Sequence, residues 1–284
     1  MTQIDAGRAP ACELARHVLL STGMATGMAT NREIARAGFV AGGLLAPLTA
    51  LVSWLRRSRM FHPVGVSCWA TVRGVDGEGP AGALGARLPD RALLRFSGAW
   101  WKRRELPDVL GCAIRLAYEP VHEKPRPADQ DLLFATVRRP WTTPFAPLST
   151  DQHDYLANDY YAVSPFDFPG LERVELRVTP DAPSPGGADR DERLIAAISA
   201  KTAGLVLSWA PYAGAFRRPD PERFSPLARL TIVGVTSLDD EALRFDPFQA
   251  GLGIEPVGFV HAMRALAYRA SQRARPAGVN EPES

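Results

Sequence analysis

Residues 64–75 read VGVSCWATVRGV, a run of alternating apolar and polar character that changes the pattern of the chain. Runs of this kind, bounded by Gly, Pro and charged residues, are typical of β-strands. Six similar runs follow: ALLRFSG (92–98), LGCAIRLAY (110–118), DLLFATVRR (131–139), LERVELRVTP (171–180), GLVLSWAP (204–211) and LARLTIVGV (227–235). Seven such runs predict a substantial antiparallel sheet, and a sheet of seven or eight strands commonly closes into a barrel to remove its edges.

The composition is that of a globular protein, and the small net charge does not indicate a strongly charged partner. Of the 284 residues, 46% are apolar and 23% are charged, and the net charge is +2. This balance, without a long basic run, argues against nucleic-acid binding. Three widely spaced cysteines fit a reducing compartment and a cytoplasmic location, with the thiols buried as small apolar groups.

The chain divides into an N-terminal helical arm (1–58), a main domain (59–276) and a disordered tail (277–284). Within the arm, residues 37–55 read AGFVAGGLLAPLTALVSWL, which is long enough to span a bilayer. Basic residues flank this segment on both sides, so no charge asymmetry orients it, and Pro47 interrupts it. We therefore expect it to pack on the domain or on a partner subunit, and we expect no membrane contact.

The chemistry is predicted to lie at the C-terminal helix, residues 261–275, HAMRALAYRASQRAR. Arg264 and Tyr268 are one helical turn apart on one face, where a guanidinium lowers the pKa of a neighbouring phenol. A phenolate is a strong ligand for ferric iron. Arg275 follows two turns later and is suited to binding a carboxylate at the edge of a flat ligand.

The segments around this helix resemble the haem catalases. Phe245-Asp246-Pro247 and Gly253-Ile254-Glu255-Pro256 are similar to the family segment that leads to its haem-binding helix, and Arg264, Tyr268 and Ser271 match the pattern of the helix itself. The resemblance implies haem b with ferric iron, and Tyr268 as its axial ligand.

Three further blocks resemble the family in the same order. Arg59 and His62, in RMFHPVG (59–65), match a propionate-binding arginine and the distal histidine. Arg95 and Ser97, in Arg-Phe-Ser, match a second propionate ligand and a serine that hydrogen-bonds the distal imidazole. The fourth block, residues 108–115, matches a structural strand. The implied fold is α+β, an antiparallel β-barrel with flanking helices and a catalase-like core.

One departure changes the expected activity. The family places an Asn beside the distal histidine, shortly after an Asp-Leu-Val strand start, whereas residues 131–136 read DLLFAT. That Asn orients peroxide, and only the hydroxyl of Thr136 offers a replacement. Compared with the family, we also expect no counterpart of the long segments that follow the haem helix. Both differences favour peroxidase chemistry over the disproportionation of hydrogen peroxide.

The resemblance therefore implies an oxidoreductase that uses a peroxide or an organic hydroperoxide and oxidises a small organic donor, and that forms a homodimer. Four alternatives stay open. The same core could rearrange fatty-acid hydroperoxides, as allene oxide synthases do, or modify a secondary metabolite. It could also be a non-catalytic haem carrier or sensor, or retain only a vestigial haem site.

Overall fold

The computed structural model describes residues 64–99, 106–119, 122–162, 164–214, 217, 220–240 and 242–258. The predicted N-terminal arm, the C-terminal helix and the tail lie outside these residues. The seven predicted strands are all present. They are β1 (Val64–Gly74), β2 (Arg91–Gly98), β3 (Leu110–Leu116), β4 (Gln130–Ala135), β7 (Leu171–Pro180), β8 (Gly204–Pro211) and β9 (Ser225–Val235).

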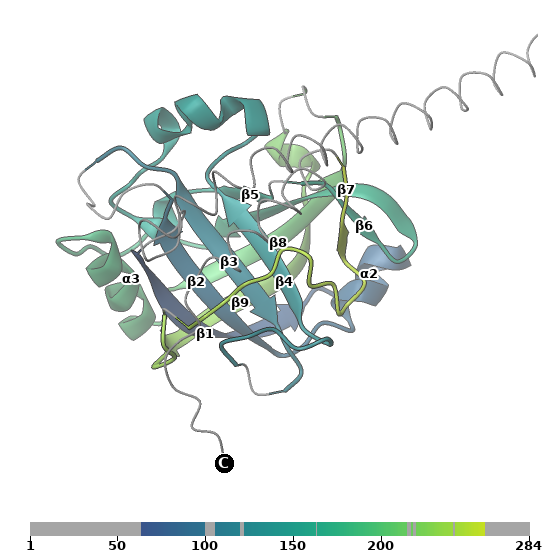
Figure 1. Cartoon of the computed structure of the whole chain (residues 1–284), viewed down its shortest axis with the longest axis horizontal. Helices are drawn as coiled ribbons and strands as arrows, with labels where there is room; N and C mark the ends of the chain where they lie inside the picture. Colours follow the sequence, from purple (N-terminus) through teal and green to yellow (C-terminus); the bar gives the residue numbers. More distant parts are fainter. Residues whose placement is uncertain are drawn as a thin grey trace, which may run out of the picture.

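The strands form a closed antiparallel barrel (Figure 1). The sheet order is β10-β6-β7-β5-β4-β3-β2-β1-β9-β8, and an additional pairing of β7 with β8 closes the ring. Eight strands make the ring, while β6 (Phe166–Phe168) and β10 (Glu255–Pro256) continue the sheet beyond β7. The fold class predicted from the sequence is therefore confirmed.

The short elements were not predicted from the sequence. They are α2 (Gly79–Gly85), α3 (Arg190–Ser199), the strand β5 (Tyr160–Ala162) and the 3-10 helices η1 (Pro140–Ser149), η2 (Tyr155–Ala157) and η3 (Pro221–Arg223). Helix α3 begins directly after the predicted loop 180–189, and the side chain of Asp189 accepts hydrogen bonds from the amides of Asp191 and Glu192. This N-cap satisfies two amides of the first turn and fixes where the helix begins.

The main core fills the barrel, because alternate residues of every strand point inward. On β2, for example, Ala92, Leu94 and Phe96 belong to this core and are fully buried. The ring of Phe96 packs on the rings of Tyr155 and Tyr160, at centroid distances of 5.2 and 6.0 Å. The barrel interior is thus occupied by side chains, so a functional site is expected on its outer face.

Two of the three cysteines lie among the described residues, and both are buried and free of disulfides. Cys68 on β1 and Cys112 on β3 belong to the barrel core, as the sequence predicted. Burial raises the pKa of the Cys68 thiol to about 12 and raises that of Cys112 as well. Neither is therefore a reactive thiol.

Among the described residues, no helix has the length and apolar character needed to cross a membrane. The segment 37–55 lies outside the described residues.

Candidate functional site: the outer face of strands β1 to β4

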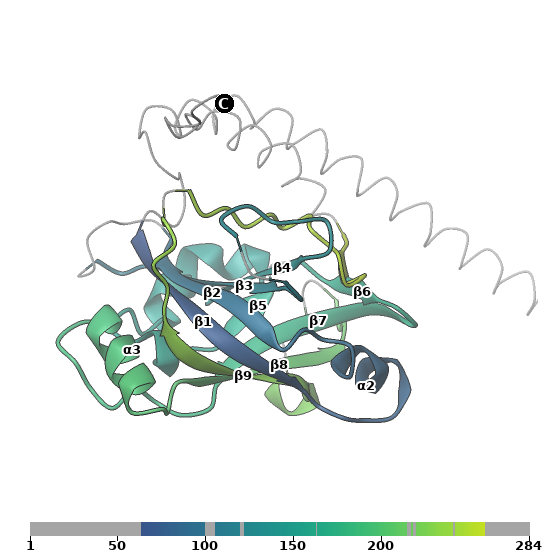
Figure 2. The ribbon, with the colours of Figure 1, turned by 90° about the horizontal axis from the view of Figure 1, so that it is seen from below.

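One outer face of the barrel is covered by the chain that follows β9. Residues 236–240 and 242–254, here called the strap, cross the outer sides of β1 to β4 and are seen in yellow-green tones in Figures 1 and 2. The amide of Thr236 donates to the carbonyl of Ser67 (2.9 Å) at one end of the strap. At the other end, the buried Gln130 side chain donates to the carbonyls of Gln249 (2.9 Å) and Ile254 (3.1 Å). The strap is therefore attached to β1 and β4.

A second apolar cluster lies between the strap and the strands. Leu243 and Phe245 of the strap are buried against Leu93 of β2 and Ala117, with four partly buried residues around them: Trp69, Ala113, Leu133 and Leu238. Burying side chains of this size stabilises a fold by roughly 1.5–3 kcal/mol each. The part of the outer face that carries this cluster is therefore covered by the strap.

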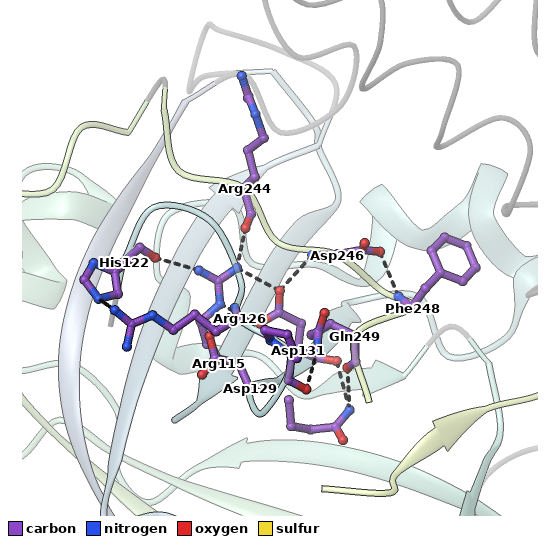
Figure 3. A network of polar contacts seen from close by, with 11 residues as sticks. Arg115, His122, Arg126, Asp129, Asp131, Arg244, Asp246, Phe248 and Gln249 are labelled. Carbon is purple, nitrogen blue, oxygen red and sulfur yellow. Dashed lines mark hydrogen bonds and ion pairs between the residues drawn. The ribbon is translucent and has the colours of Figure 1, made fainter. Parts of the chain in front are cut away.

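A fully buried ion pair fixes the middle of the strap (Figure 3). Arg115 on β3 and Asp131 on β4 are partners in the strand register, and both side chains are 0% exposed. The Nε and Nη2 atoms of Arg115 donate to the two carboxylate oxygens of Asp131, at 2.7 and 2.8 Å. The amide of Asp246 donates to the same carboxylate at 2.7 Å. The sequence predicted a structural role for residues 108–115. Within this block, Arg115 helps to hold the strap through its pair with Asp131.

The Arg115 guanidinium is satisfied by more than this carboxylate. It also donates to the carbonyls of His122 (2.7 Å) and Arg244, and it lies 4.9 Å from the centroid of the Phe245 ring. Burial raises the pKa of the Asp131 carboxyl, and the hydrogen bonds from Arg115 and the Asp246 amide act in the opposite direction. Such a pair costs much in desolvation, so losing either partner would leave an uncompensated buried charge.

Small residues form a row beside this pair. In the register of β1 to β4, Gly65 is opposite Ser97, Ser97 is opposite Gly111, and Gly111 is opposite Ala135. All four lie on the outer face, because Arg95, Arg115 and Asp131 are two or four residues away from them on the same strands. We call these four residues the small-residue row. A flat group can approach the backbone along it more closely than over large side chains.

Arg95 lies next to the small-residue row and holds a carboxylate. Its side chain is 4% exposed, and its Nε and Nη2 atoms donate to the two oxygens of Asp240, at 2.6 and 2.8 Å. The Ser67 hydroxyl donates to the same Asp240 carboxylate at 3.3 Å. The outer face of β2 is therefore built to bind a carboxylate in bidentate geometry.

The absence of a side chain at Gly65 makes room for Arg95. A Cβ atom at this position would lie 3.0 Å from the Arg95 guanidinium carbon and 2.3 Å from the Phe96 carbonyl oxygen. The arginine thus lies across the backbone of β1. The glycine of the His62 block and the arginine of the Arg-Phe-Ser block are packed together.

Thr136 does not offer its hydroxyl oxygen to this face. That oxygen accepts hydrogen bonds from the amide of Leu110 (3.1 Å) and from the hydroxyl of Thr150 (2.8 Å). Thr136 therefore joins β3 to the loop after η1. Ala135, with no polar group, is the residue of this stretch that belongs to the small-residue row.

The predicted site residues fall into two groups. Arg95 and Ser97 are both buried on the outer face of β2, and the structure places them two residues apart, as the strand period requires. Five others lie outside the described residues: Arg59, His62, Arg264, Tyr268 and Arg275. In the described ranges, no group of three or more His, Cys, Asp or Glu side chains could hold a metal ion.

The described part of the site combines two features. The Arg95 guanidinium donates to a carboxylate on the outer side of β2, and the small-residue row leaves only short side chains beside it on the neighbouring strands. Arginine and small side chains are residue types that suit a flat group carrying carboxylates.

Sequence reasoning missed two members of this face. Asp240 was not recognised as the partner of Arg95, because 145 residues separate them. The pairing of Arg115 with Asp131 was also missed, although one signal was present. Arg115 is a single charged residue inside an apolar run and Asp131 begins another, and charges beside such runs are usually paired when they are buried.

The fold has relatives among solved structures. A fungal catalase superposes with a TM-score of 0.52 at 12% sequence identity, over 77% of this chain and 58% of that chain. Catalase A from Saccharomyces cerevisiae superposes with a TM-score of 0.49 at 12% identity, over 77% of this chain and 60% of that one. No protein-family model and no curated protein matches the sequence. On the match to the fungal catalase, the chain has a catalase-like barrel fold. It spans about three-fifths of the length of these two catalases.

Proposed function

We propose that this protein binds haem b on the outer face of β1 to β4 and uses it to reduce peroxides at the expense of a small organic donor. The observation that carries the proposal is the small-residue row, flanked by an arginine that already holds a carboxylate in bidentate geometry. The catalase-like fold and the motifs of the sequence support the same assignment.

Tyr268 is the proposed ligand of the iron, and Arg264, one turn earlier on the same helix, keeps its phenol ionised. Arg59, Arg95 and Arg275 balance the propionates. The buried Arg115–Asp131 pair holds the strap at the Asp246 amide, and the strap precedes Tyr268 in the sequence.

His62 is the proposed general acid–base. It precedes Gly65 by three residues, and Gly65 is the first residue of the small-residue row. Its imidazole takes the proton from one peroxide oxygen and returns it to the other. Ser97, in register with Gly65, holds the orientation of that imidazole. Haem, when bound, supplies the iron that accepts oxidising equivalents from the peroxide.

Ala135 and Thr136 favour peroxidase activity over disproportionation. Ala135 carries no polar group, and the Thr136 oxygen already accepts two hydrogen bonds. This stretch thus provides no side-chain amide to orient hydrogen peroxide.

The ligand assignment is tested with the variant Tyr268→Phe. The variant should lose haem, or shift its visible spectrum to that of a water- or histidine-ligated form. Tyr118→Phe, which changes an exposed tyrosine, is the matched control and should keep the parental spectrum. Retention of an unchanged high-spin tyrosinate spectrum in Tyr268→Phe refutes the assignment.

The reaction is tested by product analysis with a fatty-acid hydroperoxide. In the presence of a phenolic donor, the proposal expects the corresponding alcohol and an oxidised donor. An isomer or epoxide formed without any donor indicates rearrangement instead. Reversible haem exchange without turnover of any peroxide indicates a carrier or sensor. The predicted homodimer is tested separately by light scattering of the haem-loaded protein.

A further inference from the structure

Asp240 occupies the position on Arg95 that the proposed function assigns to a haem carboxylate. The contact is bidentate, with 2.6 and 2.8 Å between the donor nitrogens and the two oxygens, and Ser67 adds a hydroxyl to the same carboxylate. Two side chains of the outer face, Arg95 and Ser67, thus donate to one carboxylate that the chain itself supplies.

The charge of Arg95 is therefore balanced before any cofactor arrives. Two opposite charges at hydrogen-bond distance attract each other strongly when one of them is buried, because water screens them less. A second carboxylate that approaches Arg95 meets a neutral pair instead of a free cation. It gains the full attraction only if Asp240 moves away.

The two partners differ in how easily they can separate. The Arg95 side chain is 4% exposed, whereas the Asp240 side chain is 39% exposed. An uncoupled Asp240 carboxylate can be hydrated at once, but an uncoupled Arg95 guanidinium would be left buried. The exchange of Asp240 for another carboxylate is thus far less costly than the simple loss of the pair.

The strap keeps Asp240 near Arg95 in either state. Thr236 is hydrogen-bonded to Ser67 on one side of Asp240, and Leu243 is buried in the outer apolar cluster on the other. The carboxylate is tethered close to the guanidinium, so it competes at a high effective concentration.

We propose that Asp240 is an internal competitor for Arg95: it neutralises the guanidinium while haem is absent and weakens the binding of the haem propionate. It is a positioning residue and not a catalytic one. This inference rests on the proposed function, because it takes a haem carboxylate to be the competing anion.

The test is a hemin titration of the haem-free protein and of Asp240→Asn, followed by absorbance in the Soret region. The variant should bind hemin about 5- to 30-fold more tightly and release it more slowly to a haem-scavenging protein, in line with a coupling of ordinary size between two sites. Hemin dimethyl ester, which has no free carboxylates, should bind the parent and the variant equally. The variant Asp240→Glu keeps the carboxylate and should stay within about 3-fold of the parent.

Asp181→Asn is the matched control, because Asp181 forms an exposed ion pair with Arg229 elsewhere on the barrel. Equal or weaker hemin binding by Asp240→Asn overturns the inference and leaves the proposed function intact. An equal gain with the dimethyl ester also overturns it. If neither the parent nor Asp240→Asn takes up hemin, the proposed function fails and the inference fails with it.

Discussion

The buried pair of Arg115 and Asp131 makes a quantitative prediction about folding. In Asp131→Asn the guanidinium keeps its contacts with the carbonyls of His122 and Arg244 but loses its only bidentate carboxylate among the described residues. Both side chains are 0% exposed, so water cannot replace the lost charge. Breaking a buried pair in this way costs about 3–5 kcal/mol, a large part of the 5–15 kcal/mol that stabilises a typical domain.

Replacing both partners gives a different result. Arg115→Met combined with Asp131→Leu removes both charges and leaves mainly the carbonyls and the Asp246 amide to be satisfied. We expect the double variant to cost no more than the worse single variant, which corresponds to a coupling energy at least equal to the cost of the milder single variant, about 3 kcal/mol or more. The assay is equilibrium unfolding in urea of the haem-free proteins, with the slope m compared to confirm that a single transition is being measured.

The exposed pair of Arg229 and Asp181 is the control, since its side chains are 58% and 37% exposed. The same analysis of that pair should give at most about 1 kcal/mol. If the single variants of Arg115 and Asp131 each cost under about 1 kcal/mol and their effects simply add, the reasoning about the buried pair is refuted.

Two further predictions concern the barrel interior. With Cys12 replaced by Ser, Cys68 and Cys112 should resist alkylation at pH 8 in the folded protein and react on unfolding, as measured by mass spectrometry. The reason is that a thiol with a pKa of about 12, as at Cys68, is thiolate in only about one molecule in 10,000 at this pH. Fast labelling without denaturant would contradict this prediction. Arg190→Met should raise the free energy of unfolding by about 1–3 kcal/mol, because the nitrogens of this buried guanidinium make no hydrogen bond within the described ranges and lie over the Tyr155 ring. Arg193→Met changes a half-buried residue of the same helix whose side chain donates to the Gly187 carbonyl, and it should lower the free energy of unfolding by at most about 1 kcal/mol. A loss of stability in Arg190→Met would show that the charge of Arg190 is compensated.

The strands of the barrel were predictable because each contributes its own alternating run. On β2, the run ALLRFSG contains Leu94 and Phe96 for the core and Arg95 and Ser97 for the outer face, and this division follows from the strand period alone. Helix α3 was not predicted, because its ten residues follow a long Pro- and Gly-rich loop and bury only Leu194, Ala197 and the unusual Arg190. Strands of three residues, such as β5, carry too little pattern to be recognised.

Residues of the site could be predicted from the sequence only where they belong to a recognisable motif. Arg95 and Ser97 lie two residues apart on the outer face of β2, their contacts with a cofactor and an imidazole stay predictions, and the partner of Arg95 comes from the distant strap. A pairing of this kind depends on which loop covers which strands, and no local pattern determines that. Likewise, the small-residue row is visible only in the register of four strands, since Gly65, Ser97, Gly111 and Ala135 are far apart in the sequence.

The most direct test of the account is a visible absorption spectrum of the purified full-length protein, recorded before and after addition of one equivalent of hemin. The account predicts a Soret band with the charge-transfer bands of ferric high-spin, tyrosinate-ligated haem. A folded protein that is colourless as purified and leaves added hemin with its free spectrum would contradict it.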